Sequence, residues 1–469
     1  MRTYVFIFCL ATLFLCSCSQ AETPHKSAAA FDGGKHWDPF LDTLQQRTIK
    51  WFLEVMPEST GLTPDRWPAT WSPSSIAAVG FALTTYPIAA ERGIITRAEA
   101  ARRTLLTLRF LWKLPQSTAE TDVAGYKGFF YHFIKKENGM REWKCELSTI
   151  DTALLLAGAL FDQSYFDNST PEEAGIRSLA DSLYRRTDWK WAMGATKAVV
   201  MGWKPKEGFH DWIWHGYNEA MILYVLALGS PTHEVPSSVW QEWTDTYLWE
   251  KHYGQTLLNF MPLFGHQYSH AWIDFRGITD PYMKQKGIDY FENSRRAVYV
   301  HRTYAIENPH QWIDYSDSVW GLTACDGPKD TTFEVKGIKR LFRSYSARGT
   351  GAEEEVDDGT LAPTAVAGSV PFAPEICIPA LKAMKTKYGE KLWTPYGFLD
   401  AFNPTYITAS TPDGWFDADY LGIDQGPIVL MIENLRNDFV WNVMKKNPYI
   451  RQGLKRAGFT GGWLDAPAK

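Results

Sequence analysis

Apolar residues recur with helical spacing through most of the chain after residue 37, whereas the alternation typical of β-strands is scarce. Twelve apolar runs with capping residues predict twelve helices, and a further run near 438–452 predicts a closing helix. The twelve lie near 38–56, 74–91, 96–112, 148–161, 171–187, 218–229, 235–258, 287–305, 316–325, 372–385, 391–402 and 426–437. The pattern therefore predicts an all-α protein.

The connections between these predicted helices alternate in length. From the first to the second helix of each pair they are long, at 57–73, 113–147, 188–217, 259–286, 326–371 and 403–425. Between pairs they are usually short, as at 91–97 and 228–233. Long loops inside compact domains are uncommon and usually functional. Six of them in alternation predict six helical hairpins closed in a ring, with every long loop at one end.

The second helix of each pair is the more apolar one. Segments 76–83, 152–160 and 220–228 are apolar on nearly all sides, so they must be buried on all sides. First helices such as 97–109 carry a charged face. We therefore expect an inner and an outer ring of helices, an (α/α)6 toroid. No linker rich in Gly, Ser or Pro divides residues 37–469, which favours a single domain.

The amino terminus has the pattern of an export signal. A short positive end precedes an apolar stretch that is too short for a comfortable membrane span. The sequence Leu15-Cys-Ser-Cys18-Ser resembles a bacterial lipobox and predicts lipidation of Cys18; ordinary cleavage nearby, or lipidation of Cys16, is the alternative. We expect a signal peptide at 1–18, a polar tether at 19–36, and a lipoprotein of the periplasm or outer membrane that touches the membrane through its anchor alone.

Composition limits the partners. The net charge of −5 is spread along the chain without a basic patch, which argues against binding of nucleic acid. Aromatic residues make up 15% of the chain, with 21 Trp. They suit either a large aromatic core or the stacking of sugar rings, and composition leaves both open. We expect a monomer that binds an oligo- or polysaccharide.

Three carboxylates stand at or just before the first turn of a predicted inner helix: Asp151, Glu219 and Asp424. Since the long loops feed the inner helices, the amino termini of those helices share the loop-covered end of the ring. Paired acids there suit cleavage of a glycosidic bond. Burial would raise the pKa of Glu219 and suit it to the role of acid. Asp424, beside backbone donors at a helix start, would stay ionised as the base.

Each of these acids also has a structural explanation. Asp151 fits a capping box that begins at Ser148, and Glu219 could complement the helix dipole. Asp424 is less needed as a cap, because Gly426 and Pro427 already begin that helix. Asp151 could instead hold a sugar hydroxyl or a water. Aromatic side chains such as Tyr217, Trp212 and Trp214 are the candidates to bury Glu219.

No cofactor and no metal site is predicted. His266 and His270 have helical metal-ligand spacing without an evident third ligand, which favours hydrogen bonds to sugar or backbone. The acidic run 353–359 does not fit an EF-hand loop and is typical of a solvated loop. Ten Trp fall in the long loops, Trp415 among them, and could form sugar subsites or pack the loops together.

Several blocks of sequence together resemble a known family. They are Gly128-Phe-Phe-Tyr-His, Glu146-Leu-Ser-Thr-Ile-Asp-Thr-Ala-Leu-Leu, Trp214-His-Gly-Tyr-Asn-Glu, His266-Gln-Tyr-Ser-His-Ala-Trp-Ile-Asp-Phe-Arg-Gly and Gly422-Ile-Asp-Gln-Gly-Pro. The chain resembles the "putative glycoamylase" family, which includes glycoside hydrolase family 144, the bacterial β-1,2-glucanases. The resemblance implies an (α/α)6 barrel, an inverting mechanism, and action on β-1,2-linked glucose chains or sophoro-oligosaccharides.

The resemblance also implies roles for individual residues. Glu219 would be the general acid and Asp424 the candidate base, with Asp151 in the substrate site. The candidates for substrate binding are Glu146, Trp214, Tyr217, His266, His270, Asp274, Arg276, Trp415 and Gln425. Two other functions compete: a non-catalytic glycan-binding lipoprotein, and a polysaccharide lyase with a Tyr, His or Arg base acting on acidic sugars. The lack of a strongly basic set of loops argues against the lyase.

Overall fold

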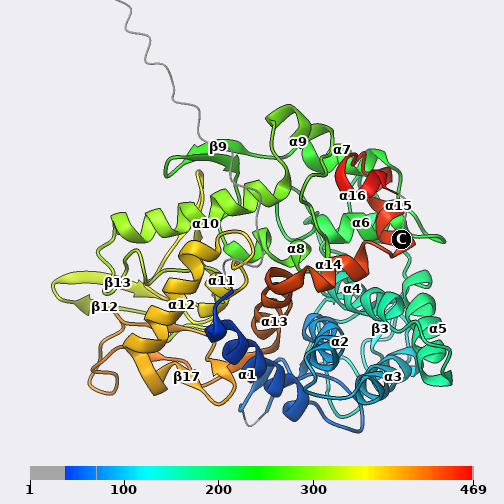
Figure 1. The fold of residues 1–469 in the computed structure, drawn as a ribbon, viewed down its shortest axis with the longest axis horizontal. Helices are drawn as coiled ribbons and strands as arrows, with labels where there is room; N and C mark the ends of the chain where they lie inside the picture. The colour runs from blue at the N-terminus through cyan, green and yellow to red at the C-terminus, as the bar shows by residue number, and fades with distance from the viewer. Residues whose placement is uncertain (1–36, 70, 467–469) are drawn as a thin grey trace, which may run out of the picture.

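Helices form the framework of the part of the chain that the computed structural model describes, residues 37–69 and 71–466 (Figure 1). The long helices are α1 (Pro39–Val55), α2 (Ile76–Glu91), α3 (Arg97–Lys113), α4 (Thr149–Tyr165), α5 (Pro171–Arg185), α6 (Met221–Gly229), α10 (Tyr290–Glu307), α12 (Pro374–Tyr388), α13 (Gly422–Asn437) and α15 (Pro448–Arg456). The short ones are α7 (Ser238–Thr244), α8 (Tyr268–Trp272), α9 (Pro281–Lys286), α11 (Pro363–Ala367), α14 (Phe439–Met444) and α16 (Gly462–Asp465). Three 3-10 turns lie at Trp191–Met193, Leu263–His266 and Gly389–Lys391.

The strands are short and lie in the connections, where they pair in small antiparallel ladders. In chain order they are β1 (Arg66–Trp67), β2 (Ser74–Ser75), β3 (Gly125–Tyr126), β4 (Phe129–Phe130), β5 (Phe133–Ile134), β6 (Leu147–Ser148), β7 (Gly202–Lys204), β8 (Gly208–Phe209), β9 (Trp249–His252), β10 (Gln255–Leu258), β11 (Ala324–Cys325), β12 (Thr331–Val335), β13 (Ile338–Phe342), β14 (Ser346–Ala347), β15 (Gly349–Thr350), β16 (Glu355–Val356), β17 (Trp393–Thr394), β18 (Gly397–Phe398), β19 (Phe402–Asn403), β20 (Trp415–Phe416) and β21 (Tyr420–Leu421).

The helices form two concentric rings, as Figure 1 shows. Helices α2, α4, α6, α8, α11 and α13 make the inner ring, in which α2 packs against both α4 and α13. Each is preceded in the chain by its outer partner, namely α1, α3, α5, α7, α10 or α12. The predicted (α/α)6 toroid is confirmed.

The inner helices α2 and α4 cross with their backbones in contact. Fourteen consecutive residues of α2, 76–89, are buried, in agreement with its apolar sequence. A Cβ atom added to Gly80 would lie 2.3 Å from the carbonyl oxygen of Leu154, and one added to Gly158 would lie 2.1 Å from that of Gly80. Glycine at these two positions is therefore what allows the helices to approach so closely.

Two predicted helices and half of a third are wrong. Segments 316–325 and 391–402 are not helical, and 235–258 is helical only in α7 before the β9–β10 hairpin. Backbone conformation explains the differences. Gly321 and Gly397 adopt φ values of +127° and +97°, and Tyr253 and Gly254 make the hairpin turn with positive φ. The apolar residues of these segments are buried by loops instead of by helix packing.

The predicted inner helices at 287–305 and 372–385 are also corrected. They correspond to α10 and α12, which are outer helices with an exposed face. The true fourth and fifth inner helices, α8 and α11, have five residues each and lie inside segments predicted as the loops 259–286 and 326–371. A run of five residues is too short to show helical periodicity. Long connections still precede each inner helix, as predicted.

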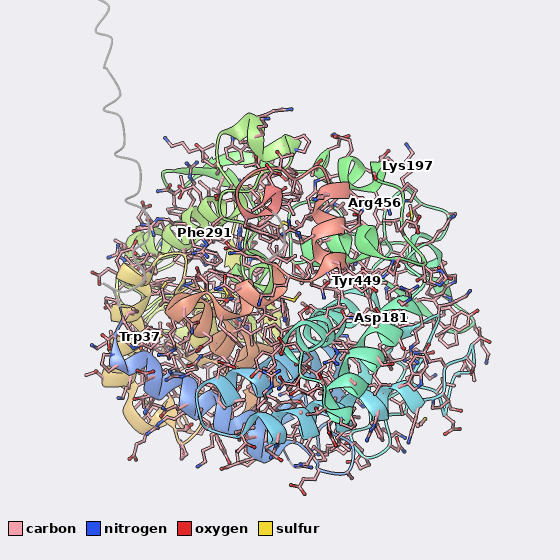
Figure 2. The ribbon with its side chains drawn as sticks, turned by 45° about the vertical axis from the view of Figure 1, so that its right-hand side comes forward. Trp37, Asp181, Lys197, Phe291, Tyr449 and Arg456 are labelled. Carbon is pink, nitrogen blue, oxygen red and sulfur yellow. The ribbon has the colours of Figure 1, made fainter. Side chains whose placement is uncertain are left out.

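The ring closes between its first and last hairpins. In α1, Gln45 donates from Nε2 to the carbonyl oxygen of Val429 at 3.0 Å and to the carboxylate of Glu433 at 2.9 Å, both in α13. Strand β1 pairs with β21, with Arg66 opposite Leu421. Of the last helices, α14 packs against α4, α8 and α13, and α15 packs against α6. In Figure 2 Tyr449 of α15 lies beside Asp181 of α5, to which its hydroxyl donates.

The sequence also predicts features of the amino terminus and the absence of a membrane-spanning helix after it. The signal peptide, the tether and Cys18 lie outside the described residues. Within the described ranges, no helix combines the length and apolarity that a bilayer crossing requires.

Candidate active site

The three predicted carboxylates lie at the starts of inner helices. Asp151 and Asp424 are the third residues of α4 and α13, and Glu219 stands two residues before α6. Burial, together with the negative charges of Asp424 and Glu219, raises the pKa of the Tyr268 hydroxyl in α8. Both carboxylates therefore act on one side chain of the inner ring, and we call this end of the ring the mouth.

Hydrogen bonds tie the starts of neighbouring inner helices together around the mouth. Side chains at or before one helix start bond to the backbone or side chain of the next. These bonds join Trp214 Nε1 to Thr149 Oγ1 at 3.0 Å, Ser269 Oγ to the Glu219 carbonyl at 2.9 Å, Gln267 Nε2 to the Ala365 carbonyl at 2.7 Å and Thr364 Oγ1 to the Asp424 carbonyl at 2.7 Å. These hydrogen bonds link the starts of neighbouring inner helices, as the predicted convergence requires.

Glu219 is placed as a proton donor. Its Oε2 is buried and has no hydrogen-bond partner in residues 37–69 and 71–466, although the residue as a whole is only half-buried. Burial, with a smaller contribution from the charge of Asp151, raises the pKa of Glu219 to about 7. Its carboxyl group is therefore protonated in a large fraction of the molecules near neutral pH. Trp212, one of the rings expected to bury it, is instead 73% exposed.

Asp424 is almost fully buried, and the expectation that it stays ionised at its ordinary pKa is wrong. Burial, with the nearby charges of Asp326 and Asp65, raises the pKa of Asp424 to about 8. Burial and the Asp424 charge also raise the pKa of Asp400 well above its ordinary value. The hydrogen bond between the two side chains opposes this rise at Asp424, and when Asp400 carries the proton that the pair shares, Asp424 is ionised. Asp424 remains the candidate base.

Asp151 is part of a cap and of a charged cluster. Its backbone N–H donates to Ser148 Oγ at 3.2 Å, as in the predicted cap, and the Ser148 hydroxyl donates to its carboxylate. His132 lies with Nε2 3.6 Å from Asp151 Oδ1 and Nδ1 2.8 Å from Glu146 Oε1. Although burial opposes it, the charge of these two carboxylates raises the pKa of His132 to about 9. Sequence reasoning quoted His132 in a block without giving it a role.

Sequence reasoning also missed a set of carboxylates beside Asp424. These are Asp65, Asp326, Asp400, Asp417 and Asp419, drawn from three different loops. Arg66 lies among them, and its Nη1 is 2.7 Å from Asp326 and 3.4 Å from Asp419. Asp417 and Asp419 stand just before the Gly422 block, which was the one available sequence signal. One oxygen from each of Asp326, Asp400 and Asp417 lies within 4.8 Å of the others, a spacing that could hold a cation.

His266 and His270, predicted to bind substrate, are fully buried. His266 Nε2 lies 3.1 Å from the Phe260 carbonyl, and His270 Nε2 lies 3.1 Å from Ser294 Oγ. Burial lowers the pKa of His266 to about 4 and that of His270 to about 3, so both are neutral. The structure gives these two side chains a role in packing around α8, and substrate would not reach them.

Asp274 and Arg276 lie at the opposite end of the ring from the mouth, which corrects their prediction as substrate ligands. They follow the carboxyl end of α8 and pair with each other at 2.7 Å. Arg276 also pairs at 2.9 Å with Asp438, the residue that ends α13. Asp274 and Arg276 are close to His266 in sequence, but α8 lies between them. The start of α8 is at the mouth, whereas these two residues follow its other end.

The remaining predicted ligands are mostly structural. Trp214 is 7% exposed and braces α4 through Thr149, while Tyr217 is 1% exposed and stacks on Tyr290 at 5.8 Å. Gln425 is 1% exposed and donates to the Phe398 carbonyl at 3.3 Å. Trp415 remains partly exposed beside Cys325, Ala362 and Ala401. Glu146, paired with His132, keeps its place at the mouth next to Asp151.

Comparison with known proteins agrees with this geometry. The family model "Glycoamylase: Putative glucoamylase" matches residues 211–448, just over half of the chain. A crystal structure of a "putative glucoamylase" from Bacteroides uniformis is 30% identical, with a TM-score of 0.79, over 91% of this chain and 98% of that one. An endo-β-1,2-glucanase from Chitinophaga pinensis, solved with sophorotriose and glucose, is 26% identical with a TM-score of 0.78, over 92% of this chain and 100% of its own.

A curated relative from Parabacteroides distasonis, named exo β-1,2-glucooligosaccharide sophorohydrolase (non-reducing end), is 27% identical over 89% of this chain. The chain spans 58% of the length of that relative. The match to the Bacteroides uniformis structure extends over nearly the whole of both chains. Together with the family model and the shared toroid, these similarities show that the chain belongs to the glycoamylase family and is related to bacterial β-1,2-glucanases.

Proposed function

We propose that this protein is a glycoside hydrolase that cleaves β-1,2-linked glucose chains or sophoro-oligosaccharides by an inverting mechanism. The observation that carries the proposal is the carboxyl group of Glu219 at the mouth of the ring, whose raised pKa of about 7 keeps a large fraction of it protonated near neutral pH. Its second support comes from the relatives, two of which are named for hydrolysis of β-1,2-glucan or its oligosaccharides.

In this mechanism Glu219 donates its proton to the glycosidic oxygen as the bond to the leaving sugar breaks. Asp424, in its ionised form, removes a proton from the attacking water or from a group that relays it, and the anomeric carbon inverts. After the reaction Glu219 is ionised and Asp424 is protonated, so both must exchange protons with solvent before the next cycle. Asp151, Glu146 and His132 would hold sugar hydroxyls or a water beside Glu219.

The direct test is to incubate the protein with linear β-1,2-glucan and to follow reducing ends, product sizes and, by proton NMR, the anomer first formed. We expect β-1,2-linked products released as the α-anomer. Glu219→Gln should lower kcat by about 100-fold or more, because a general acid contributes roughly 10²–10⁴. Glu234→Gln, on an exposed residue of the short connection after α6, is the matched control and should act like wild type.

Two results would contradict the proposal: no new reducing ends from β-1,2-glucan, or undiminished cleavage by Glu219→Gln. A non-catalytic binding protein would retain the glucan without new reducing ends. A lyase would give products that absorb in the ultraviolet because they carry an unsaturated sugar. Product size decides between cleavage inside the chain and release of disaccharides from an end, since relatives are named for both actions.

We further propose that the protein is an exported, monomeric lipoprotein anchored through Cys18. The lipobox-like sequence before Cys18 and the polar segment 19–36 support this location, which would place the enzyme in the periplasm or on the outer membrane. Cys18→Ser should abolish labelling with a radioactive fatty acid and move the protein from the membrane to the soluble fraction. Equal labelling of the variant would refute the anchor. Light scattering of the soluble form tests the monomer.

A further inference from the structure

Asp326, Asp400 and Asp417 are brought together by the backbones of the loops that carry them. Strand β19 pairs with β20, and beside that ladder the Asp417 N–H donates to the Ala401 carbonyl and the Asp400 N–H to the Asp419 carbonyl, each at 3.0 Å. The Asp326 N–H donates to Asp400 Oδ2 at 2.9 Å. One carboxylate oxygen from each of the three lies within 4.8 Å of the others, so the cluster is set by main-chain contacts.

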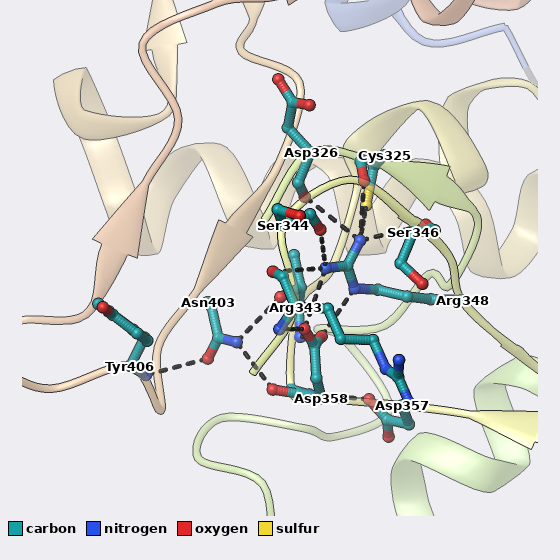
Figure 3. Close-up of polar contacts among 12 residues, drawn as sticks. Cys325, Asp326, Arg343, Ser344, Ser346, Arg348, Asp357, Asp358, Asn403 and Tyr406 are labelled. Atoms are coloured by element: carbon teal, nitrogen blue, oxygen red, sulfur yellow. Dashed lines mark hydrogen bonds and ion pairs between the residues drawn. The ribbon is translucent and has the colours of Figure 1, made fainter. Parts of the chain in front are cut away.

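The neighbouring arginines balance the charge of Asp326 but not the charges of Asp400 and Asp417. Arg66 binds both oxygens of Asp326, at 2.7 and 3.3 Å, and also approaches Asp65 at 3.5 Å. Arg348 is fully buried, but it pairs with Asp358 at 2.7 Å and donates to the Cys325 carbonyl at 2.8 Å. Figure 3 shows the Asp326 carboxylate directed away from the Arg348 guanidinium. Both cations are therefore engaged by groups other than Asp400 and Asp417.

Two carboxylate oxygens of the cluster also lack a donor. Asp400 is 1% exposed, and apart from the neighbouring Asp424 carboxyl its Oδ1 meets no hydrogen-bond donor in the described ranges; Asp417 Oδ2 meets none there. A buried polar atom without a partner is costly, and each instance in a native protein calls for an explanation such as a bound ion. This observation is separate from the clustering of the acids and indicates a positively charged ligand.

We infer that Asp326, Asp400 and Asp417 bind a divalent cation, and that Ca²⁺ is the ion the site suits. Calcium binds oxygen ligands at about 2.3–2.6 Å, so two oxygens on one Ca²⁺ lie at most about 5 Å apart, which agrees with the spacing of the three carboxylates. An all-oxygen ligand set does not favour zinc, and water can complete the coordination on the partly exposed side of Asp417. The ion would fasten the loops before α11 and α13 to each other beside Asp424.

This inference goes beyond the proposed function, and its test needs no substrate. The protein is treated with EDTA, transferred to chelator-free buffer, and titrated with CaCl₂ by calorimetry while its Tm is followed. We expect one Ca²⁺ per chain and a rise in Tm. Terbium, a luminescent substitute for calcium, should emit on excitation of tryptophan, since Trp415 stands two residues from Asp417.

Asp400→Asn and Asp417→Asn should each weaken Ca²⁺ binding by roughly tenfold or more, because affinity follows the number of charged ligands. Asp413→Asn removes the same charge from the same loop, at a residue that pairs with Lys391 and is 72% exposed, and should bind like wild type. If Asp400→Asn does not fold, the partly exposed Asp417 decides alone. Absence of calcium heat and terbium emission, or wild-type affinity in Asp417→Asn, would overturn the inference and leave shared protons to balance the cluster.

Discussion

Buried carboxylates at the two ends of the ring differ in what surrounds them, and α13 shows both cases. At its start, Asp424 Oδ2 has no hydrogen-bond partner within the described part of the chain. Near its end, Glu433 is as deeply buried, but it accepts from Gln45 at 2.9 Å and from Arg436 at 3.1 Å. The two acids are nine residues apart in one helix.

The same contrast separates Glu219 from Asp274. Burial raises the pKa of Glu219 to about 7. Asp274 is buried too, and burial acts on it in the same direction, but Arg276 and Lys445 outweigh it and lower the pKa of Asp274. Burial with basic partners fixes a charge and holds elements together, whereas burial without them leaves a carboxyl able to exchange a proton. The mouth is therefore where chemistry is expected.

The largest effect should come from replacing each of the two acids of α13 by its amide in separate variants. Asp424→Asn should lower kcat on β-1,2-glucan by about 10²–10⁴-fold, since a proton acceptor contributes that much, while its Tm stays at or above that of wild type. Glu433→Gln should keep kcat within a few-fold and lower the Tm. Steady-state kinetics and thermal unfolding of both variants check this. Equal activity of the two variants would contradict the assignment of chemistry to the start of α13 and of stability to its end.

Breaking the ion pair at the far end should cost stability without costing chemistry. Asp274→Asn leaves Arg276 and Lys445 without their buried partner, and we expect a loss of about 3–5 kcal/mol in the free energy of unfolding. Urea denaturation measures the loss, and activity per folded molecule should not change. Glu292→Gln, in a partly exposed i,i+4 pair with Arg296, is the control and should cost about 0.5 kcal/mol or less. A similar small loss in Asp274→Asn would contradict the structural role.

The raised pKa of Glu219 should make wild type less stable as pH rises. Because its folded pKa of about 7 exceeds the ordinary 4.5, its neutral form stabilises the fold fully below pH 4.5, and this contribution is lost as pH rises through 7. Glu219→Gln lacks this loss and should exceed wild type by about 1–2 kcal/mol near pH 8, allowing for partial exposure. Unfolding at about pH 5 and 8 measures the difference, with Glu234→Gln as control.

The smallest expected effect concerns His132, which couples Asp151 to Glu146. Its folded pKa of about 9 lies above the ordinary 6.5, so its charge stabilises the fold fully below pH 6.5, and this contribution is lost as pH rises through 9. His132→Gln should therefore be less stable than wild type by about 1 kcal/mol near pH 6 and should match it near pH 10. An NMR titration of the imidazole with a midpoint below 6.5 would refute the coupling.

Periodicity in the sequence was enough to predict helices whose apolar surface is long. Residues 76–83 and 152–160 are apolar on nearly every side, and both belong to inner helices, as expected. Helices α8 and α11 were not predicted, because five residues do not complete two turns. Their neighbours α10 and α12 were predicted as inner helices instead. The alternation of connections survived this error because α8 and α11 still follow long segments.

The candidate site was predictable where a residue's role depends on its own helix. Glu219 and Asp424 precede or begin apolar helices, and the alternation of long and short connections places the starts of those helices at one end of the ring. Asp326 and Asp400 could not be found this way, because their neighbourhood depends on loops from separate hairpins meeting through β19 and β20. Asp274 was misplaced because five residues of α8 carry the chain from one end of the ring to the other.

The contact between Gln45 and Glu433 joins positions 388 residues apart, and it sets the order in which the molecule can be completed. Helix α2 is made early, yet α13, which covers one of its faces, consists of residues 422–437. During synthesis, that apolar face stays uncovered until nearly the whole sequence has been made. Closure of the ring thus depends on contacts of long sequence separation, which form slowly and leave hydrophobic surface exposed to aggregation or to chaperones in the meantime.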